Sequence, residues 1–195
     1  MRLGSRVVYT PARLAARVAQ MGRAISRDYR GRSLDVIVML ENGFMFAADL
    51  VRRIDVPVVC HFVREEMHDV ELSGFLRREV SFTQRPVLKG RDVLLVDAVL
   101  ETGVPQDFLV RRLLDSGPRS LKLAVLLDKP QGRKVSLKAD YIGFVAASNN
   151  LVGYGLSGSS GHGRNLPYIA AKSASRASRR KVKRPRTSGV GRRRK

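Results

Sequence analysis

The residue types best suited to chemistry in this chain follow the apolar run Val93–Val96. They are Asp97, Glu101 and the pair Thr102-Gly103. The free amides at the start of a helix, together with the helix dipole, can hold a phosphate, and a nearby carboxylate can bind ribose hydroxyls or accept a proton. The same pattern also fits two solvated loop acids and a glycine that only turns the chain. Both interpretations stay open from the residues alone.

These side chains must be positioned by alternating strands and helices. Apolar runs predict buried strands over residues 34–40, 56–63, 92–96, 121–127 and 141–145, and helical periodicity predicts helices over 11–30, 43–54 and 103–116. The charged stretch 64–78 has no apolar periodicity and is predicted to be a long exposed loop. Residues 146–168 are rich in Gly, Ser and Asn and are predicted to fold as a small cap. The alternation predicts an α/β fold with a mainly parallel sheet.

Ligands of open parallel sheets bind at the carboxyl ends of the strands. This rule selects four short segments of the chain: Glu41-Asn42-Gly43, Glu65–Asp69, Asp97–Gly103 and Asp128-Lys129-Pro130. We expect them to lie along one edge of the sheet.

The net charge is concentrated at one end of the chain. The 195 residues include 37 Lys and Arg and 17 Asp and Glu, for a formal charge of +20, and 44% of them are hydrophobic, which excludes a wholly disordered chain. Residues 172–195 carry 12 basic and no acidic side chains, so residues 1–171 carry only +8. We therefore predict one domain, 1–171, and a basic disordered tail, 172–195. Such a tail favours weak nucleic-acid contact through phosphates, with a merely solubilising tail as the alternative.

Cysteine, histidine and hydropathy exclude several other classes of protein. The one cysteine, Cys60, lies in an apolar run and is predicted to be a small buried hydrophobe, which excludes a disulfide framework. His61, His68 and His162 lack the spacing of a structural zinc site. No apolar stretch is long enough for a membrane span, and the N-terminus has no signal core. A cytoplasmic protein is expected.

Seven motifs, found in order between about residue 5 and residue 169, are specific when taken together. They are Val7–Thr10, Ile25–Tyr29, Gly43–Leu50, Leu126–Pro130, Lys138–Phe144, Leu151–Leu156 and Arg164–Ile169. They resemble the hypoxanthine–guanine phosphoribosyltransferase family of the bacterial type. The resemblance implies a type I phosphoribosyltransferase fold, in which a central mainly parallel sheet is flanked by helices and capped by a hood to which residues 146–169 contribute. It also implies purine salvage, the transfer of phosphoribosyl from phosphoribosyl pyrophosphate to a purine nitrogen with Mg²⁺ assisting the pyrophosphate.

The resemblance assigns roles to eight residues of this chain. Glu101 takes the catalytic position of an aspartate near the reactive purine nitrogen, with its arm lengthened by one methylene. The ribose and phosphate residues are Asp97, Thr102 and Gly103. The purine-binding residues are Lys129 and Val152, and the pyrophosphate-binding residues are Gly43 and Arg164.

Other ligand positions depart from the family pattern. Ala98 replaces the second acid of the ribose site, and Glu41 replaces the lysine of the pyrophosphate loop. Pro105 replaces a hydroxyl residue of the phosphate cradle, and Asn150 replaces the aromatic that stacks on the purine. The magnesium-binding aspartate is Ser157, so the metal ligand is unknown, with Asp107 and Asp128 as the carboxylates that could reach it instead. The Ser-Tyr pair of the catalytic loop is Met67-His68.

These departures predict a phosphoribosyltransferase-like protein whose activity is weak or lost, so its status as an enzyme stays open. The alternative is a non-catalytic nucleotide-binding or regulatory protein on the same scaffold. Mg²⁺ is the expected cofactor of an active form, and purine bases, purine nucleotides and phosphoribosyl pyrophosphate are the expected ligands. The resemblance also implies a dimer or tetramer. Which purine is preferred is left open.

Overall fold

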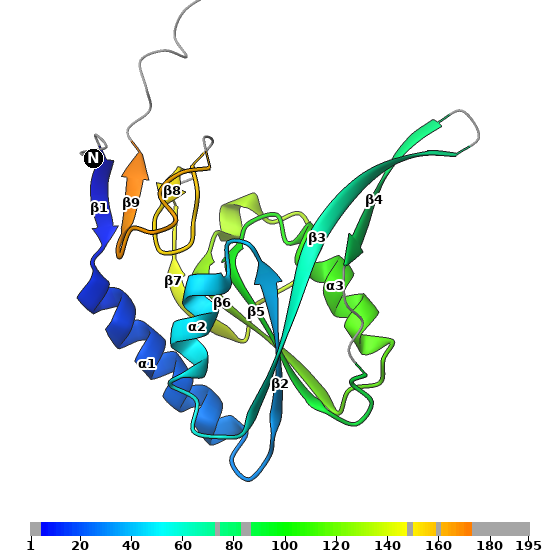
Figure 1. Cartoon of the computed structure of the whole chain (residues 1–195), viewed down its shortest axis with the longest axis horizontal. Coiled ribbons are helices and arrows are strands. Elements are labelled where there is room, and N and C mark those ends of the chain that lie inside the picture. The colour runs from blue at the N-terminus through cyan, green and yellow to red at the C-terminus, as the bar shows by residue number, and fades with distance from the viewer. Residues whose placement is uncertain (1–4, 73–74, 83–86, 148–149, 159–160, 173–195) are drawn as a thin grey trace, which may run out of the picture.

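The central sheet is mainly parallel. The computed structural model describes residues 5–72, 75–82, 87–147, 150–158 and 161–172. Within them the sheet order is β4-β3-β2-β5-β6-β7, formed by the strands β2 (Leu34–Leu40), β3 (Val58–Leu72), β4 (Phe75–Phe82), β5 (Asp92–Leu100), β6 (Ser120–Asp128) and β7 (Tyr141–Val145). Every neighbouring pair is parallel except β3 and β4 (Figure 1). The predicted α/β fold is therefore confirmed.

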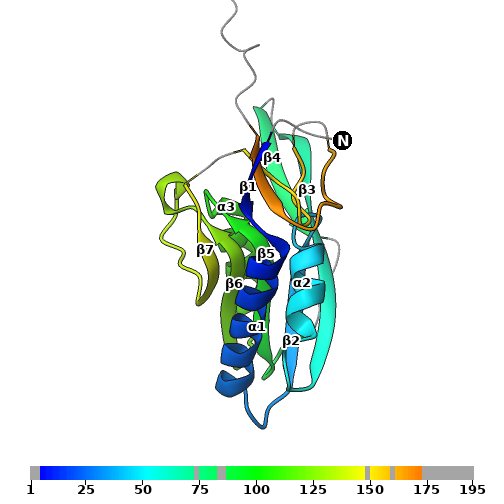
Figure 2. The same cartoon turned by 90° about the vertical axis from the view of Figure 1, so that its left-hand side faces the viewer.

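Helices cover both faces of this sheet (Figures 1 and 2). Helices α1 (Pro11–Asp28) and α2 (Phe44–Val51) lie on one face, α3 (Val104–Leu114) lies on the other, and a 3-10 turn, η1 (Pro130–Gly132), follows β6. The Thr10 side chain caps α1 by accepting a hydrogen bond from the Arg13 amide at 3.3 Å. The buried stripe of α1 is the predicted one: Leu14, Val18, Met21 and Ile25. None of the described helices is long and apolar enough to cross a bilayer.

The two faces of the sheet form two separate cores. In β2, Val36 and Val38 pack with α1 and α2, whereas Ile37 and Met39 pack with the core that includes Leu109 of α3. Successive residues of a strand point to opposite faces, so burial on both sides requires a continuous apolar run. This is why the central strands were recognisable in the sequence.

A small hood lies beyond the carboxyl ends of the strands (Figure 1). Its antiparallel strands come from both ends of the described chain, in the order β1 (Ser5–Tyr9), β9 (Ile169–Lys172), β8 (Leu151–Val152). The Tyr9 ring stacks on Phe144 of β7 with centroids 4.3 Å apart, which joins the hood to the main sheet. The predicted cap is thus present. Residues 173–195 lie outside the described residues, so the domain boundary and the disordered tail stay predictions.

The prediction of a loop over residues 64–78 was wrong. Strand β3 continues to Leu72 and pairs antiparallel with β4, from Glu65 opposite Phe82 to Leu72 opposite Phe75. A two-stranded hairpin satisfies its backbone hydrogen bonds without a buried face, so no apolar alternation marks it in the sequence. The sequence signal for it was Ser73-Gly74, residue types that are common in two-residue hairpin turns.

Cys60 is exposed, not buried as predicted. It lies in the first half of β3, where β2 is the hydrogen-bonded neighbour and β4 has not yet begun to pair. Val59 and Phe62 of the same half-strand are also 46% and 49% exposed. The apolar run therefore marks a strand near the edge of the sheet rather than a fully covered one.

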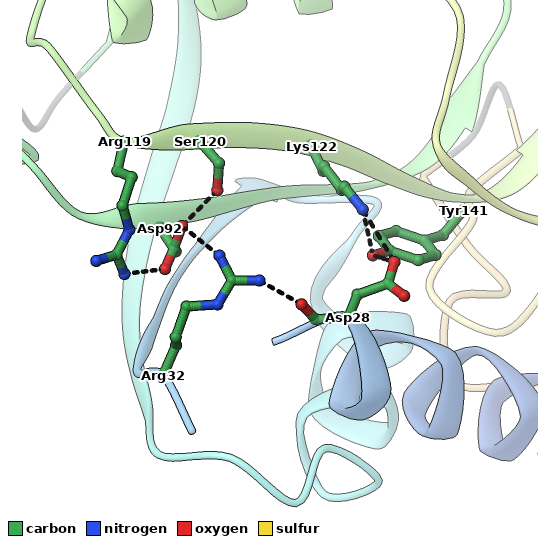
Figure 3. A network of polar contacts seen from close by, with 7 residues as sticks. All are labelled: Asp28, Arg32, Asp92, Arg119, Ser120, Lys122 and Tyr141. Carbon is green, nitrogen blue, oxygen red and sulfur yellow. Dashed lines mark hydrogen bonds and ion pairs between the residues drawn. The ribbon is translucent and has the colours of Figure 1, made fainter. Parts of the chain in front are cut away.

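A polar network ties the amino ends of the strands to the end of α1 (Figure 3). The Asp92 carboxylate at the start of β5 is 1% exposed and accepts hydrogen bonds from Arg32 at 3.3 Å, from Ser120 at 2.6 Å and from Arg119. The Arg119 guanidinium holds the pKa of Asp92 below its ordinary value of 3.8, although burial acts in the opposite direction. The buried charge is thus compensated on three sides.

The same network continues to β6 and β7. Asp28, the last residue of α1, accepts hydrogen bonds from Lys122 at 2.9 Å and from the Tyr141 hydroxyl at 2.5 Å. The hydrogen bond from Tyr141 is the largest cause that lowers the pKa of Asp28, followed by the bond from Lys122. One helix end is thereby joined to three strands.

Replacing Asp92 by Asn removes the charge that the three donors share. We expect the variant to lose about 2 kcal/mol of unfolding free energy at neutral pH, because a hydrogen bond to a charged group is worth about 1.5–3 kcal/mol. The folded-state pKa of Asp92 lies below 3.8, so its charge stabilises the fold above that pH and the contribution is lost as the pH falls through the folded-state pKa. Urea unfolding of both proteins between neutral and acid pH measures the difference and its disappearance.

The matched control is Asp107→Asn. Its carboxylate pairs with the exposed Arg111 at 2.8 Å, one turn along α3, and exposed pairs contribute little. We expect a much smaller loss. Equal losses in the two variants would contradict the account of the network.

Candidate functional site

The polar segments that follow the strands lie along one edge of the sheet, as the parallel order predicts (Figure 1). Glu41-Asn42-Gly43 follows β2, Glu101-Thr102-Gly103 follows β5, and Lys129 follows β6. Strand β5 is four residues longer than predicted and ends at Leu100, so Asp97 lies within the strand, in register with Val125 of β6. The fourth segment, Glu65–Asp69, lies inside β3.

Glu101 and Lys129 form an ion pair across the ends of β5 and β6. The Lys129 Nζ lies 2.9 Å from Glu101 Oε2, and the Lys129 amide donates to the Leu100 carbonyl at 2.9 Å. The Lys129 side chain is 8% exposed, whereas that of Glu101 is 41% exposed. Glu101 is therefore not a free loop acid. The pair offers a cationic donor and an anionic acceptor side by side.

Asp97 is held within the protein. It is 8% exposed, its Oδ1 accepts from the Ala98 amide at 2.6 Å, and its Oδ2 accepts from Gln106 Nε2 at 2.5 Å. Gln106 also donates to the Val99 carbonyl at 3.2 Å, while its own side-chain oxygen is buried without a hydrogen bond from any described residue. The interpretation of Asp97 as a solvated acid was therefore wrong.

Sequence reasoning missed Gln106. It is 6% exposed, and on α3 it lies three and seven residues before the buried Leu109 and Leu113. That spacing places a polar side chain on the buried face of a helix, which is the signal that could have found it. A buried amide at such a position needs a polar partner, and Asp97 supplies one.

The Thr102-Gly103 turn begins α3. Gly103 has a φ of +77°, and a Cβ there would lie 2.8 Å from the Val135 side chain, so the position favours glycine both by conformation and by space. The Thr102 hydroxyl accepts from the Val104 amide at 3.4 Å, and Pro105 has no amide hydrogen. The first turn of α3 thus has fewer free donors for an anion than the sequence pattern alone suggested.

Arg133, which sequence reasoning also missed, braces this turn from the loop after η1. Its guanidinium donates to the Glu101 carbonyl at 3.0 Å and the Leu100 carbonyl at 3.2 Å, and it forms an ion pair with Asp128. The stretch 129–137 has no periodicity that would single out this arginine. The contact occupies Asp128, one of the two carboxylates considered for a metal.

Arg164 joins the hood to the segment that follows β2. Its guanidinium donates to the Gly155 carbonyl and the Asn42 side chain, each at 2.6 Å, and it lies 3.2 Å from Glu41 Oε2. The other oxygen of Glu41 pairs with Arg64 of β3. Two guanidinium groups therefore share one carboxylate at this edge.

Gly43, the other predicted pyrophosphate residue, is brought to the same place. It is buried at the start of α2, and a Cβ there would lie 2.6 Å from the Met39 carbonyl. Arg164 contacts its neighbour Asn42, so the structure brings the two predicted residues together.

The hood positions the remaining predicted residues. Val152 is fully buried in β8, opposite Ala170 of β9, while Asn150 is exposed just before β8 and Ser157 is half-buried after the turn 153–156. Tyr154 in that turn donates its hydroxyl hydrogen to Asp49 of α2. Burial and the Asp49 contact raise the pKa of Tyr154. Val152 thus packs within the hood.

The described residues do not fit a protein-held magnesium ion. They contain no group of three or more His, Cys, Asp or Glu side chains arranged for a metal. Ala98 has no oxygen ligand to offer and Ser157 carries no charge, while Asp107 and Asp128 are paired with Arg111 and Arg133. Hard divalent cations prefer carboxylate oxygens, and here the nearby carboxylates serve other partners. We therefore assign no step to a metal held by the chain.

Comparison with known proteins agrees with this geometry. The phosphoribosyl transferase domain matches residues 8–157. The hypoxanthine-guanine phosphoribosyltransferase of Dictyostelium discoideum is 32% identical over 167 residues, which cover 84% of this chain and 92% of that protein. The bifunctional protein TilS/HprT of Listeria innocua is 33% identical over 171 residues, 84% of this chain, but this chain spans only 25% of its length.

Solved structures show the same fold. A hypoxanthine-guanine phosphoribosyltransferase from Bacillus anthracis has a TM-score of 0.75 at 31% identity, and the match covers 86% of this chain and 98% of that one. The type I phosphoribosyltransferase fold expected from the resemblance is thereby confirmed. With a family match over most of the domain and a relative matched over nearly its whole length, this chain belongs to the hypoxanthine–guanine phosphoribosyltransferase family.

Proposed function

We propose that this chain is a purine-salvage phosphoribosyltransferase-like protein that keeps a purine-nucleotide pocket but transfers the phosphoribosyl group weakly or not at all. The observation that carries the proposal is the contact between Glu41 and Arg164. By family resemblance Arg164 meets the pyrophosphate of the substrate, and here a carboxylate of the chain itself balances its charge. Electrostatic stabilisation of the leaving group is what such a site must supply.

The purine end of the pocket has the chemistry that the proposal needs. A 6-oxopurine presents a carbonyl oxygen beside a ring nitrogen that carries or loses a proton. The Lys129 ammonium can donate to that oxygen, and the Glu101 carboxylate can accept from the neighbouring N–H. Because Lys129 is nearly buried, a hydrogen bond that it makes is little weakened by solvent.

The pyrophosphate end opposes the reaction. A pyrophosphate entering beside Arg164 meets the negative charge of Glu41, and two unit charges 4 Å apart interact by about 1–4 kcal/mol at a protein surface. Displacing Glu41 also breaks its contact with Arg64. Both effects weaken the binding of phosphoribosyl pyrophosphate relative to a nucleoside monophosphate.

The ribose end has lost a ligand as well. Ala98 cannot bind a hydroxyl, and Asp97 already accepts from Gln106 and from the Ala98 amide. Losses at two subsites together favour nucleotide retention over turnover. A non-catalytic nucleotide-binding or regulatory protein on the same scaffold is the limiting case of this proposal. A dimer or tetramer, nucleic-acid contact through the tail and a cytoplasmic location stay predictions.

Restoring the two missing charges should restore transfer. We expect the wild-type chain to form little nucleotide from hypoxanthine or guanine and phosphoribosyl pyrophosphate, and Glu41→Lys/Ala98→Asp to form it at least about a hundredfold faster, because one transition-state contact is worth about 2–4 kcal/mol. Steady-state assays with Mg²⁺ and each purine measure the rates.

The control Asp115→Lys/Ser136→Asp makes the same charge changes at exposed positions and should leave the rate at the wild-type level. A wild-type kcat in the ordinary enzyme range, roughly 1–10³ s⁻¹, would contradict weak or lost activity.

Lys129→Gln tests the purine end separately. We expect GMP to bind the variant about tenfold or more weakly, since a hydrogen bond from a charged group contributes about 1.5–3 kcal/mol, while ribose 5-phosphate binds both proteins equally. Calorimetric titration measures both affinities. Lys138→Gln, an exposed change in the segment before β7, is the control and should bind GMP as the wild type does. If no purine nucleotide binds the wild type, the nucleotide pocket is not retained.

A further inference from the structure

A second pocket lies at the end of the sheet opposite the candidate site. It has a volume of about 640 Å³, within the range of small-molecule sites. The end of α1, the turn before β2 and the segment before β3 form its wall, with these lining residues: Arg23, Ser26, Arg27, Arg30, Gly31, Arg32, Ser33, Asp55, Val56 and Pro57. In Figures 1 and 2 these segments meet at the amino ends of the strands, far from the hood.

The pocket is strongly cationic. Four arginines line it against a single carboxylate, that of Asp55. Arg32 is held by the buried Asp92, but the guanidinium groups of the other three make no hydrogen bond or ion pair with any residue that the structure describes. These three are Arg23, Arg27 and Arg30.

Helix stability does not account for this arrangement. Arg23 and Arg27 are four residues apart on α1, and like charges at that spacing destabilise a helix. The dipole of α1 favours one cation in its last turn, which explains Arg27 alone. Elsewhere the chain supplies a nearby acid, as in the pairs Arg52–Asp49 and Arg111–Asp107.

The walls of the pocket are fixed without a ligand. The Ser26 hydroxyl donates to the Gly22 carbonyl at 2.8 Å and accepts from the Asp55 amide at 2.9 Å. The Leu34 amide donates to the Pro57 carbonyl at 2.9 Å. These bonds hold α1 and the two adjoining segments together, so binding an anion requires ordering of the arginine side chains and little else.

We propose that this pocket is a second, non-catalytic site that binds a small polyphosphate anion. Guanidinium groups bind phosphate oxygens in pairs and keep their charge at all physiological pH values. Three unpaired guanidinium groups around one concavity suit a ligand with two or more phosphates better than a single carboxylate. Val56 and Pro57 give the pocket an apolar wall against which the base of a nucleoside polyphosphate can pack.

The test is calorimetric titration of the full chain with inorganic tripolyphosphate at about 150 mM salt. We expect Arg27→Gln/Arg30→Gln to weaken binding at least about tenfold. Asp55→Asn removes the opposing carboxylate and should tighten it. The control Lys89→Gln/Lys138→Gln removes the same charge at exposed positions outside the pocket and should bind as the wild type does.

Two outcomes would overturn the proposal. Equal weakening in both double variants, or in neither, would mean that the overall charge of the chain, including residues 173–195, binds the anion. Competition between tripolyphosphate and GMP would assign the anion to the candidate nucleotide site. Titration with ATP distinguishes the sources of the phosphates, since tighter binding than tripolyphosphate indicates contact with the apolar wall and equal binding indicates phosphate contact alone. Either ATP result, with loss in the pocket variant, supports the site.

Discussion

A parallel sheet buried on both faces sends the carboxyl ends of its strands to one edge, and the rest of this molecule depends on that constraint. Backbone groups at the strand ends need partners, and the loops that supply them carry the polar side chains. At the carboxyl edge these loops bring Glu41, Glu101 and Lys129 to one side of the fold. At the amino edge Asp92 and Asp28 anchor the strands to α1 (Figure 3). One edge is therefore available for ligands, while the other is tied together.

The motifs that carry the family resemblance are largely packing motifs. Gly143 leaves room for the Leu126 carbonyl, which would lie 2.4 Å from a Cβ at that position. Tyr154 of the hood turn is bonded to Asp49 of α2, so two motifs distant in sequence hold each other in place. Changing these residues costs stability directly, whereas a ligand-facing position such as Ala98 can change while the fold persists. Family membership and catalytic competence are consequently separable properties of this chain.

The sequence was sufficient for the central strands, the helices and the edge at which the site lies, because periodicity and apolar runs report burial directly. It was insufficient for contacts made between distant residues. Glu41 and Arg164 are 123 residues apart, and nothing in the spacing of either one indicates that they meet. The hairpin β3–β4 was missed because backbone pairing alone defines it. Asp97 was placed in a loop because an aspartate after an apolar run resembles a strand end, although its partner Gln106 allows the strand to continue.

The distribution of compensated charge completes the argument. At the carboxyl edge each described cation of the site has an acid: Lys129 has Glu101, Arg133 has Asp128, and Arg64 and Arg164 share Glu41. A site that binds a highly charged anion needs cations whose charge is still available, and here the chain has used that charge on itself. At the amino edge the guanidinium groups lining the second pocket are not compensated by described residues. The positive charge available to a multiply charged anion has thus shifted, within the described domain, from the edge where the family performs its chemistry to the edge where the fold is anchored.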